Sequence, residues 1–352
     1  MELDPLLLQA IAADASDVLF NPGAPPSIRV NGVLSAMGTE PLADGPVRGW
    51  LEQWLDEPAR ESLKKDKTHD FALNRHGRRF RASAYTVGGS LGLALRLLPE
   101  VIPTPEKLGL PSSVTALVRR PGGLLVVSGA TGQGKSTSQA SLIDLLNRTQ
   151  PCHVVTLEDP IEFVHHSQKA VIDQRELGRD FNDFAGALKH VVRQRPDVVL
   201  VGELREPDAM QAALTLAETG HLVIATLHSG DAVLSLPRIV ESFEQGRQGL
   251  VRAQLAAVLL GVLNQRLLHG NSGRLVLAAE VLVNTPAVAR LIRDGHFEQL
   301  YSAMEMDAPA GHQTMNHAIA GLVARHAVAK AEGQRHSMFR ESLPSRAAEA
   351  RG

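Results

Sequence analysis

The segment GATGQGKS at residues 129–136 constrains the fold more strongly than any other part of the chain. It matches the pattern G-x-x-x-x-G-K-S/T, with the apolar run LLVVS directly before it and a helical pattern directly after it. In a strand–loop–helix unit of this kind, the glycines allow backbone N–H groups to surround a phosphate at the amino end of the helix. Because both flanks are present, a phosphate-binding loop in an α/β domain explains the segment far better than a chance glycine-rich turn does.

The residues of this loop have distinct predicted roles in binding ATP. Lys135 is expected to reach the β- and γ-phosphates, and the Ser136 hydroxyl is expected to ligate Mg²⁺. ATP and Mg²⁺ are therefore the expected cofactors. The predicted nucleotide-binding segment consists of Gly129, Ala130, Thr131, Gly132, Gln133, Gly134, Lys135, Ser136 and Thr137.

Apolar runs and helical patterns alternate around this loop. Such alternation predicts a mostly parallel sheet with helices on both faces. From residue 250 the pattern becomes helical, as in VRAQLAAVLLGVLNQRLL (251–268) and PAVARLIRDG (286–295). The alternating segments are 122–129, 136–148, 153–159, 183–194, 197–203, 208–220 and 221–229.

Two acidic segments follow the loop at the ends of apolar strands. The first, TLEDPIEF, carries Glu158, Asp159 and Glu162 beside a proline, and the second, DVVLVGELR, carries Glu203. A P-loop enzyme needs acids for its metal ion and its attacking water, and open α/β sheets bind ligands at the carboxyl ends of their strands. We therefore predict that Glu203 faces the γ-phosphate and its Mg²⁺, although either acidic cluster taken alone also fits solvated loop charge.

Two histidines, His221 and His228, bracket the apolar run HLVIATLH. If this run is one strand, their separation puts them at its opposite ends and on opposite faces. They are therefore not expected to share a metal ion. The pattern alone leaves a functional role and an ordinary core role equally open.

The first hundred residues are predicted to form a small α+β domain. A short helix at LLLQAIAADASD precedes strand-like runs at 27–34 and 80–87, and a longer helix is expected over 47–67. Trp50 and Trp54 lie four residues apart on one face of that helix. We interpret them as core residues.

A proline-rich stretch separates this domain from the rest of the chain. Residues 99–112 contain four prolines and no periodicity, which is typical of an interdomain linker. We expect an N-terminal domain at 1–98 and an ATPase domain at 113–352. Within the latter, C-terminal helices are expected from about residue 286 and a disordered tail from about residue 335.

Composition limits the partners and the compartment. A formal net charge of −2 and an aromatic content of 4% provide neither the electrostatic footprint nor the stacking surface that nucleic acid needs. The single cysteine, Cys152, excludes an internal disulfide and any multi-cysteine zinc site. The chain shows no signal-peptide pattern and no apolar run long enough to span a membrane, so we expect a cytoplasmic protein.

An ordered series of motifs resembles the secretion ATPase superfamily, and within it the PilT-type twitching-motility ATPases that retract type IV pili. The resemblance extends over nearly the whole chain. The matching segments are ASDVLF at 15–20, GAPPSIRVNG at 23–32, RRFRASAY at 78–85, GATGQGKST at 129–137, TLEDPIEFVH at 156–165, VIDQRELGRD at 171–180, PDVVLVGELR at 196–205, ETGHLVIATLHS at 218–229, NTPAVARLIRDG at 284–295 and GHQTMNHAIAGLV at 311–323.

This resemblance implies a PAS-like N-terminal domain, a RecA-like motor domain and a hexameric ring that hydrolyses ATP. Glu162 matches the water-activating acid of the family's Asp box, and Glu158 and Asp159 belong to the same nucleotide-binding segment. Glu203 matches an atypical Walker B acid that follows a glycine.

The same resemblance implies further site residues and partners. His221 and His228 match a His box near the nucleotide, and Arg81 and Arg96 match basic residues that reach the ATP of a neighbouring subunit. The implied partners are other copies of the chain in a homohexamer, a pilus platform protein of the inner membrane and a second pilus ATPase. The chain is therefore expected to dock at the cytoplasmic side of the pilus base.

Some positions depart from the family pattern. The family's retraction motif corresponds to AVARLIRD at 287–294, in which Ala289 stands where arginine is common. Gln194 and Arg195 replace an acidic pair that is often found just before the Walker B strand, and Leu19 stands where a histidine is frequent. These departures leave the choice between a main retraction motor and an accessory paralogue open. A pilus-assembly or type II secretion ATPase is the first alternative, followed by a RecA-like DNA translocase and a non-hydrolysing scaffold.

Overall fold

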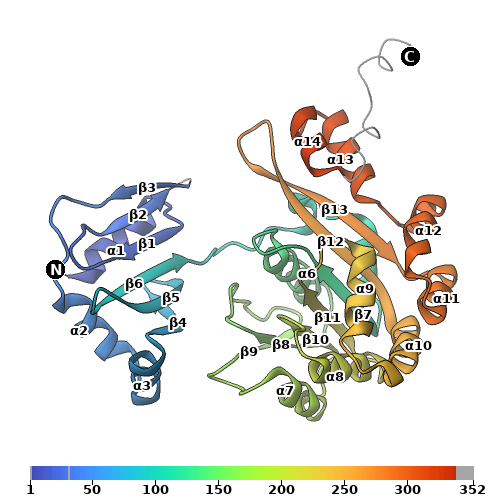
Figure 1. Ribbon diagram of the computed structural model, residues 1–352, viewed down its shortest axis with the longest axis horizontal. Helices are drawn as coiled ribbons and strands as arrows, with labels where there is room; N and C mark the ends of the chain where they lie inside the picture. The colour runs from blue at the N-terminus through green and yellow to red at the C-terminus, as the bar shows by residue number, and fades with distance from the viewer. Residues whose placement is uncertain (1, 31, 338–352) are drawn as a thin grey trace. The chain divides into compact units, whose positions relative to one another are not determined.

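The computed structural model describes residues 2–30 and 32–337 of the 352-residue chain (Figure 1). The chain divides into two compact units, Met1–Val101 and Ile102–Gly352. The boundary falls inside the proline-rich stretch. The later part of that stretch includes a short helix, α4 (Pro105–Leu108), which contacts α6 (Lys135–Thr149) of the second unit.

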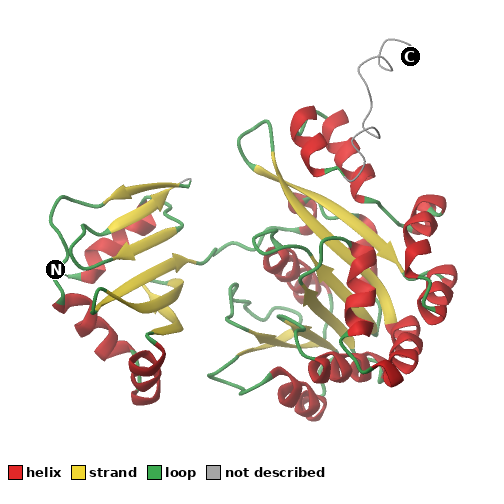
Figure 2. Ribbon diagram, viewed as in Figure 1, coloured by secondary structure: helices red, strands yellow, loops and turns green. Residues whose placement is uncertain are grey.

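The first unit is an antiparallel sheet packed against helices (Figure 2). The strand order is β3-β2-β1-β6-β5-β4. Alternate strand residues such as Val18, Ala82 and Leu95 point into a core shared with the helices, so the residues between them lie on the opposite face. The elements are α1 (Leu3–Ala12), β1 (Asp17–Phe20), β2 (Ser27–Val30), β3 (Val33–Ala36), α2 (Gly45–Trp54), α3 (Glu57–Asp66), β4 (Thr68–Arg75), β5 (Arg78–Val87) and β6 (Ser90–Leu97).

Two predicted elements of this unit are wrong in extent. The run at 27–34 is not one strand but the hairpin of β2 and β3, in which Val30 pairs with Val33. The helix predicted over 47–67 is divided into α2 and α3, because Pro58 fits only the first turn of a helix and Asp56 caps α3 by accepting from the Ala59 N–H at 3.0 Å.

The two tryptophans belong to the core, as predicted. Both are partly buried against the apolar cluster of the first unit. The ring of Trp50 meets Phe20 edge to face, with 5.2 Å between the ring centroids. Trp54 lies against Phe71, and the Arg75 guanidinium covers its ring.

The second unit is built on a mostly parallel sheet, which confirms the prediction. The strand order is β13-β12-β7-β11-β10-β8-β9, and β13 is antiparallel to β12. Successive residues of β7 enter two different cores, Leu124 on one face and Leu125 on the other. The elements up to this sheet's last strand are α5 (Ser112–Leu117), β7 (Gly123–Ser128), β8 (His153–Glu158), β9 (Val171–Glu176), α7 (Phe184–Val191), β10 (Val198–Val201), α8 (Pro207–Glu218), β11 (Leu222–Leu227), α9 (Ala232–Glu241), α10 (Gln248–Val258), β12 (Leu259–His269) and β13 (Leu275–Val283).

The helical prediction for 251–268 is wrong in its second half. The chain changes from α10 to β12 at Leu259, and β12 then pairs with β7 and β13. Most of β12 is buried, so its sequence lacks the alternation that marks a half-exposed strand. Gly261 marks the close approach of β13, since a Cβ atom there would lie 2.5 Å from the Leu282 carbonyl oxygen.

Helices complete the second unit after the sheet. They are α11 (Pro286–Asp294), α12 (Leu300–Met306), α13 (Met315–Ala324) and α14 (Lys330–His336). The predicted tail from about residue 335 begins inside α14, and its part beyond residue 337 lies outside the described residues. Across residues 2–30 and 32–337, no helix combines the length and the apolar character needed to cross a membrane.

Candidate active site

The phosphate loop connects the end of β7 to the start of α6. Gly129, Gly132 and Gly134 have φ angles of 146°, 80° and 76°, a region that favours glycine. At Gly129 the close approach of β12 adds a second requirement, because a Cβ atom would lie 2.8 Å from the Gln265 carbonyl oxygen. Gly134 begins α6 without any side-chain cap, so the first N–H groups of the helix remain open to an anion.

Lys135 is held by the backbone of its own loop. Its Nζ atom donates to the carbonyl oxygens of Gly129 at 2.8 Å and Ala130 at 2.9 Å, and only 8% of the residue is exposed. Burial lowers the pKa of the Lys135 ammonium, and the negative charges of Glu203 and Glu162 oppose that effect. The lysine thus lies within electrostatic reach of both acids.

The other loop residues differ in how firmly they are held. Gln133 ties the loop to β12, because its Oε1 atom accepts from the Leu267 N–H at 2.6 Å. Ala130 and Thr131 are exposed, whereas Ser136 and Thr137 are half-buried at the start of α6. A hydroxyl at Ser136 can therefore face a ligand at the helix end.

Glu203 lies just beyond the carboxyl end of β10. Its Oε1 atom accepts from Arg205 Nε at 2.7 Å and lies 3.2 Å from His228 Nε2. Partial burial by itself raises the pKa of Glu203, but the hydrogen bond from Arg205 and the charges of His228 and Arg205 leave that pKa below its ordinary value. The carboxylate is therefore charged at neutral pH.

His228 joins Glu203 to Lys135. Lys135 Nζ lies 3.5 Å from His228 Nδ1, and the other ring nitrogen faces Glu203. Burial and the neighbouring lysine charge lower the pKa of His228. A neutral ring that accepts at Nδ1 and donates at Nε2 fits both contacts.

Gly202 explains why the acid of β10 follows a glycine. A Cβ atom at Gly202 would lie 3.1 Å from the Leu157 carbonyl oxygen and 3.2 Å from Glu158 Cα. The Gly202 N–H already donates to Leu157 at 2.7 Å. The missing side chain lets the ends of β8 and β10 come together and brings Glu203 beside the acidic turn.

The acidic turn after β8 is held by side chains of β9. Gln174 Nε2 donates to Glu158 Oε1 at 3.1 Å and to the Phe163 carbonyl at 2.8 Å, and Glu176 accepts from the Ile161 N–H at 3.0 Å. Asp159 is exposed and Glu162 is half-buried. The turn thus presents Glu162 from a fixed backbone, while Glu158 is engaged by the turn itself.

The structure separates the two histidines of the predicted His box. Leu227 at the carboxyl end of β11 pairs with Ser128, which places His228 beside the phosphate loop. Leu222 pairs with Gly123 at the opposite, amino ends of the same two strands. His221 precedes Leu222, and its Nδ1 atom lies 3.1 Å from the Leu216 carbonyl. The six residues of β11 therefore separate His221 from the phosphate loop of the same chain. The prediction that His221 lies near the nucleotide bound by its own chain is wrong.

Similarity to known proteins agrees with this geometry. A family model described as "Type II/IV secretion system protein" matches residues 103–330. The chain belongs to this family. The type IV pilus retractation ATPase PilT of Pseudomonas aeruginosa is 35% identical over 344 residues, which are 97% of this chain and 100% of that protein.

Two further members are similar over most of their length. The type IV pilus ATPase PilU of Pseudomonas aeruginosa is 36% identical, covering 96% of this chain and 89% of that protein. The crystal structure of the pilus retraction motor PilT with bound ADP superposes with a TM-score of 0.91 at 37% identity, covering 97% and 99% of the two chains. The predicted family and fold class are confirmed, and the chain is a secretion ATPase.

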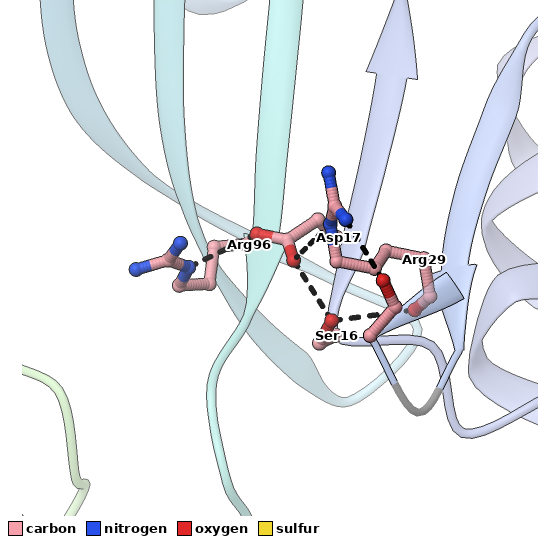
Figure 3. A network of polar contacts seen from close by, with 5 residues as sticks. Ser16, Asp17, Arg29 and Arg96 are labelled. Carbon is pink, nitrogen blue, oxygen red and sulfur yellow. Dashed lines mark hydrogen bonds and ion pairs between the residues drawn. The ribbon is translucent and has the colours of Figure 1, made fainter. Parts of the chain in front are cut away.

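In this secretion ATPase, the predicted arginines lie in the first unit. Arg81 on β5 and Arg96 on β6 are directly paired across the sheet, on the face opposite the core. Arg96 Nε donates to Asp17 at 3.0 Å, and Arg81 Nη2 lies 3.5 Å from Asp70 (Figure 3 shows the Arg96 contact). The two side chains thus share one open surface.

Several residues of the site escaped the sequence analysis. Gln174 and Glu176 hold the acidic turn, although they lie in a motif that was recognised. Asn264 and Gln265 support the loop from behind, bonded to Ser128 at 3.0 Å and Ser138 at 2.8 Å. Asn264 and Gln265 were missed because residues 251–268 were interpreted as a helix. Two amide side chains in a largely apolar run were the sequence signal that could have pointed to them.

Proposed function

We propose that this chain is a ring-forming motor that hydrolyses ATP to drive retraction of type IV pili. The observation that carries the proposal is the end-to-end similarity to PilT, over 97% of this chain and 100% of that protein. The intact phosphate loop and the acids around Lys135 support a working ATPase rather than a scaffold.

The loop geometry supports binding of the ATP triphosphate. The open N–H groups of α6 and the Lys135 ammonium together provide donors for the β- and γ-phosphates. The Ser136 hydroxyl would hold Mg²⁺ together with phosphate oxygens, as the corresponding serine or threonine does in other P-loop enzymes. The bound Mg²⁺ would neutralise charge that develops on the phosphates.

The acids are proposed to act on the attacking water. Glu162 lies within electrostatic reach of Lys135 on a turn fixed by β9, and a carboxylate oxygen of Glu162 would accept the water's proton. Glu203 would orient the metal and its water. His228, donating to Glu203 and accepting from Lys135, would keep the acid and the cation in register.

The site is proposed to be completed by a neighbouring subunit. Residues of the second unit provide a lysine and two acids near the loop, whereas Arg81 and Arg96 lie exposed on the first unit. An arginine supplied in trans stabilises charge on a transferred phosphoryl group. In a closed ring every site has a neighbour that can supply this arginine, and a homohexamer is the state we propose.

The motor is proposed to work at the cytoplasmic side of the inner membrane. Its partners there would be the pilus platform protein and a second pilus ATPase. No DNA-dependent activity is proposed. The chain is 35% identical to PilT and 36% identical to the type IV pilus ATPase PilU, so the identities do not choose between these two relatives. An accessory pilus motor is therefore the second candidate function.

A gene deletion combined with purified protein tests this function. The purified chain should hydrolyse ATP with Mg²⁺, without stimulation by DNA, and Lys135→Ala should be inactive. Deletion should leave cells over-piliated and unable to twitch. Loss of surface pili would favour an assembly ATPase, and retained twitching that becomes weak under load would favour the accessory motor.

A further inference from the structure

A row of charged residues crosses the open face of the first unit's sheet. Asp17 on β1 is paired with Arg29 on β2 and with Arg96 on β6, and Arg96 is paired with Arg81 on β5. Directly paired residues place their side chains on the same face of a sheet. Asp17 thus lies between two of the three arginines and is shielded, with 20% of its side chain exposed.

Asp17 divides its two oxygens between these arginines. Oδ1 accepts from Arg96 Nε at 3.0 Å, while Oδ2 lies 3.7 Å from Arg29 Nε and accepts from the Ser16 hydroxyl at 2.8 Å. Figure 3 shows Asp17 between Arg96 and the pair formed by Ser16 and Arg29. Ser16 and Arg29 thus share Oδ2, and Oδ1 is left to Arg96.

The atom through which Arg96 binds decides what the contact can do. Asp17 engages Nε, and the terminal nitrogens of Arg96 point away from the network in Figure 3. Within residues 2–30 and 32–337, these Nη groups have no hydrogen-bond or ion-pair partner. An arginine binds phosphate with its planar fork of donors, so a contact at Nε can leave both Nη groups available to a phosphate.

Arg81 is held differently. Its contact with Asp70 uses Nη2 at 3.5 Å, which occupies one of the terminal groups that a phosphate would need. The Arg96 side chain is also more exposed than that of Arg81, at 66% against 42%. The two arginines predicted to act in trans are therefore not equivalent.

We propose that Asp17 is a positioning residue, which holds Arg96 by Nε so that its two Nη groups face the terminal phosphate of ATP on a neighbouring subunit. This inference rests on the proposed function. An ion pair whose arginine is largely exposed contributes little to stability, but a restrained side chain loses less freedom when it binds. Asp17 should therefore affect turnover through Arg96 and affect folding only slightly.

A double-mutant cycle in the full-length ring tests the inference. Asp17→Ala should lower kcat by roughly 10-fold and also raise the KM for ATP, as expected when a group that contacts the γ-phosphate is misplaced. Asp17→Asn keeps an acceptor for Nε and should retain most activity. In Arg96→Ala or Arg96→Lys backgrounds, Asp17→Ala should cause no further loss. Arg29→Ala serves as the matched control, because it removes the other partner of Asp17, and it should leave kcat near the wild-type value.

Binding gives a readout that does not depend on turnover. Asp17→Ala should weaken binding of ATPγS and leave binding of ADP unchanged, because only the former carries a γ-phosphate. Equal weakening of both, additive losses in the Arg96→Ala background, or an equal loss in Arg29→Ala would overturn the inference. If Asp17→Ala fails to assemble, Asp17→Leu in the same backgrounds decides between the outcomes, because it keeps the size of the side chain and offers Nε no acceptor.

The cycle also separates this inference from the proposed function. Wild-type turnover in Arg96→Ala, with Lys135→Ala inactive, would overturn the positioning role and leave the ATPase in place. Activity in Lys135→Ala would instead remove the proposed ATPase site itself, and the positioning role with it.

Discussion

The phosphate loop and the open face of the N-terminal sheet both carry cations proposed for the same phosphate, yet they are built in opposite ways. Lys135 is 8% exposed and donates to two carbonyl oxygens of its own loop. The Arg96 side chain is 66% exposed and contacts one carboxylate through a single nitrogen. The lysine of the loop is thus held by contacts within one chain. Arg96 keeps Nη donors that another molecule can use.

The strongest test of this difference mixes two inactive proteins. Lys135→Ala and Arg96→Ala should each lower turnover by ~10³-fold or more, because each removes charge stabilisation from the phosphoryl group. Mixed rings contain interfaces that join an intact arginine to an intact loop, so mixing should restore part of the ATPase rate.

Its control is Lys135→Ala mixed with the Lys135→Ala/Arg96→Ala double variant, which should remain inactive. If wild-type rates persist in a strict monomer carrying Arg96→Ala, the comparison fails, since the arginine would then play no part between subunits.

Removing one acid beside the loop should have the next largest effect. Glu203→Gln keeps the size of the side chain but removes the charge that orients metal and water, so turnover should fall by ~10²-fold while ATP still binds. Glu162→Gln should behave in the same way. The measurements are steady-state hydrolysis and the dissociation constant of ATP, with the exposed Glu206→Gln as the control. Failure of either acid variant to bind ATP would make that acid structural.

The backbone approach that brings Glu203 to the site can be tested separately. At Gly202→Ala the new Cβ atom would lie 3.1 Å from the Leu157 carbonyl oxygen, so β10 must move away from β8. We expect turnover to fall by ~10-fold and stability to fall by about 1–3 kcal/mol, as for other overpacked sites. Gly246→Ala is the matched control, since a Cβ atom there meets nothing within 4 Å. An unchanged kcat in Gly202→Ala would show that this approach does not position the acid.

His165 follows the acidic turn and should make the stability of the protein depend on pH. Its replacement should not change turnover at neutral pH. Burial and the neighbouring His166 lower the pKa of His165 from 6.5 to about 4. His165 is therefore protonated near pH 6.5 in the unfolded chain, but only near pH 4 in the folded chain. The free energy of unfolding decreases as pH falls through this range.

His165→Leu should remove this dependence, which amounts to about 3 kcal/mol by the linkage between pKa and stability. The measurement is the free energy of unfolding from denaturant titrations at pH 7 and pH 4, with the exposed His190→Leu as control. If His165→Leu loses as much stability as the wild type between these values, the partly buried His165 ring does not have a lowered pKa in the folded chain.

Much of the architecture was readable from local patterns in the sequence. The phosphate loop depends on glycines and a lysine at set spacing between a strand and a helix, and the acids follow buried strands whose apolar runs are unmistakable. These features are local, because conformational freedom at glycine and strand burial leave their mark on neighbouring residues. The sequence by itself therefore determined the fold class, the family and the position of the predicted phosphate loop between β7 and α6.

Contacts between distant strands were decided only by the tertiary structure. The sequence of β12 was interpreted as a helix, because a strand buried on both faces lacks the alternation of polar and apolar residues. The roles of its amide residues Asn264 and Gln265 were missed for the same reason. Which histidine faces the loop depends on the direction of β11 between its neighbours, and the partner of Arg96 depends on the pairing of β1 with β6. Pairing register joins residues far apart in the chain, and no local pattern of residues encodes it.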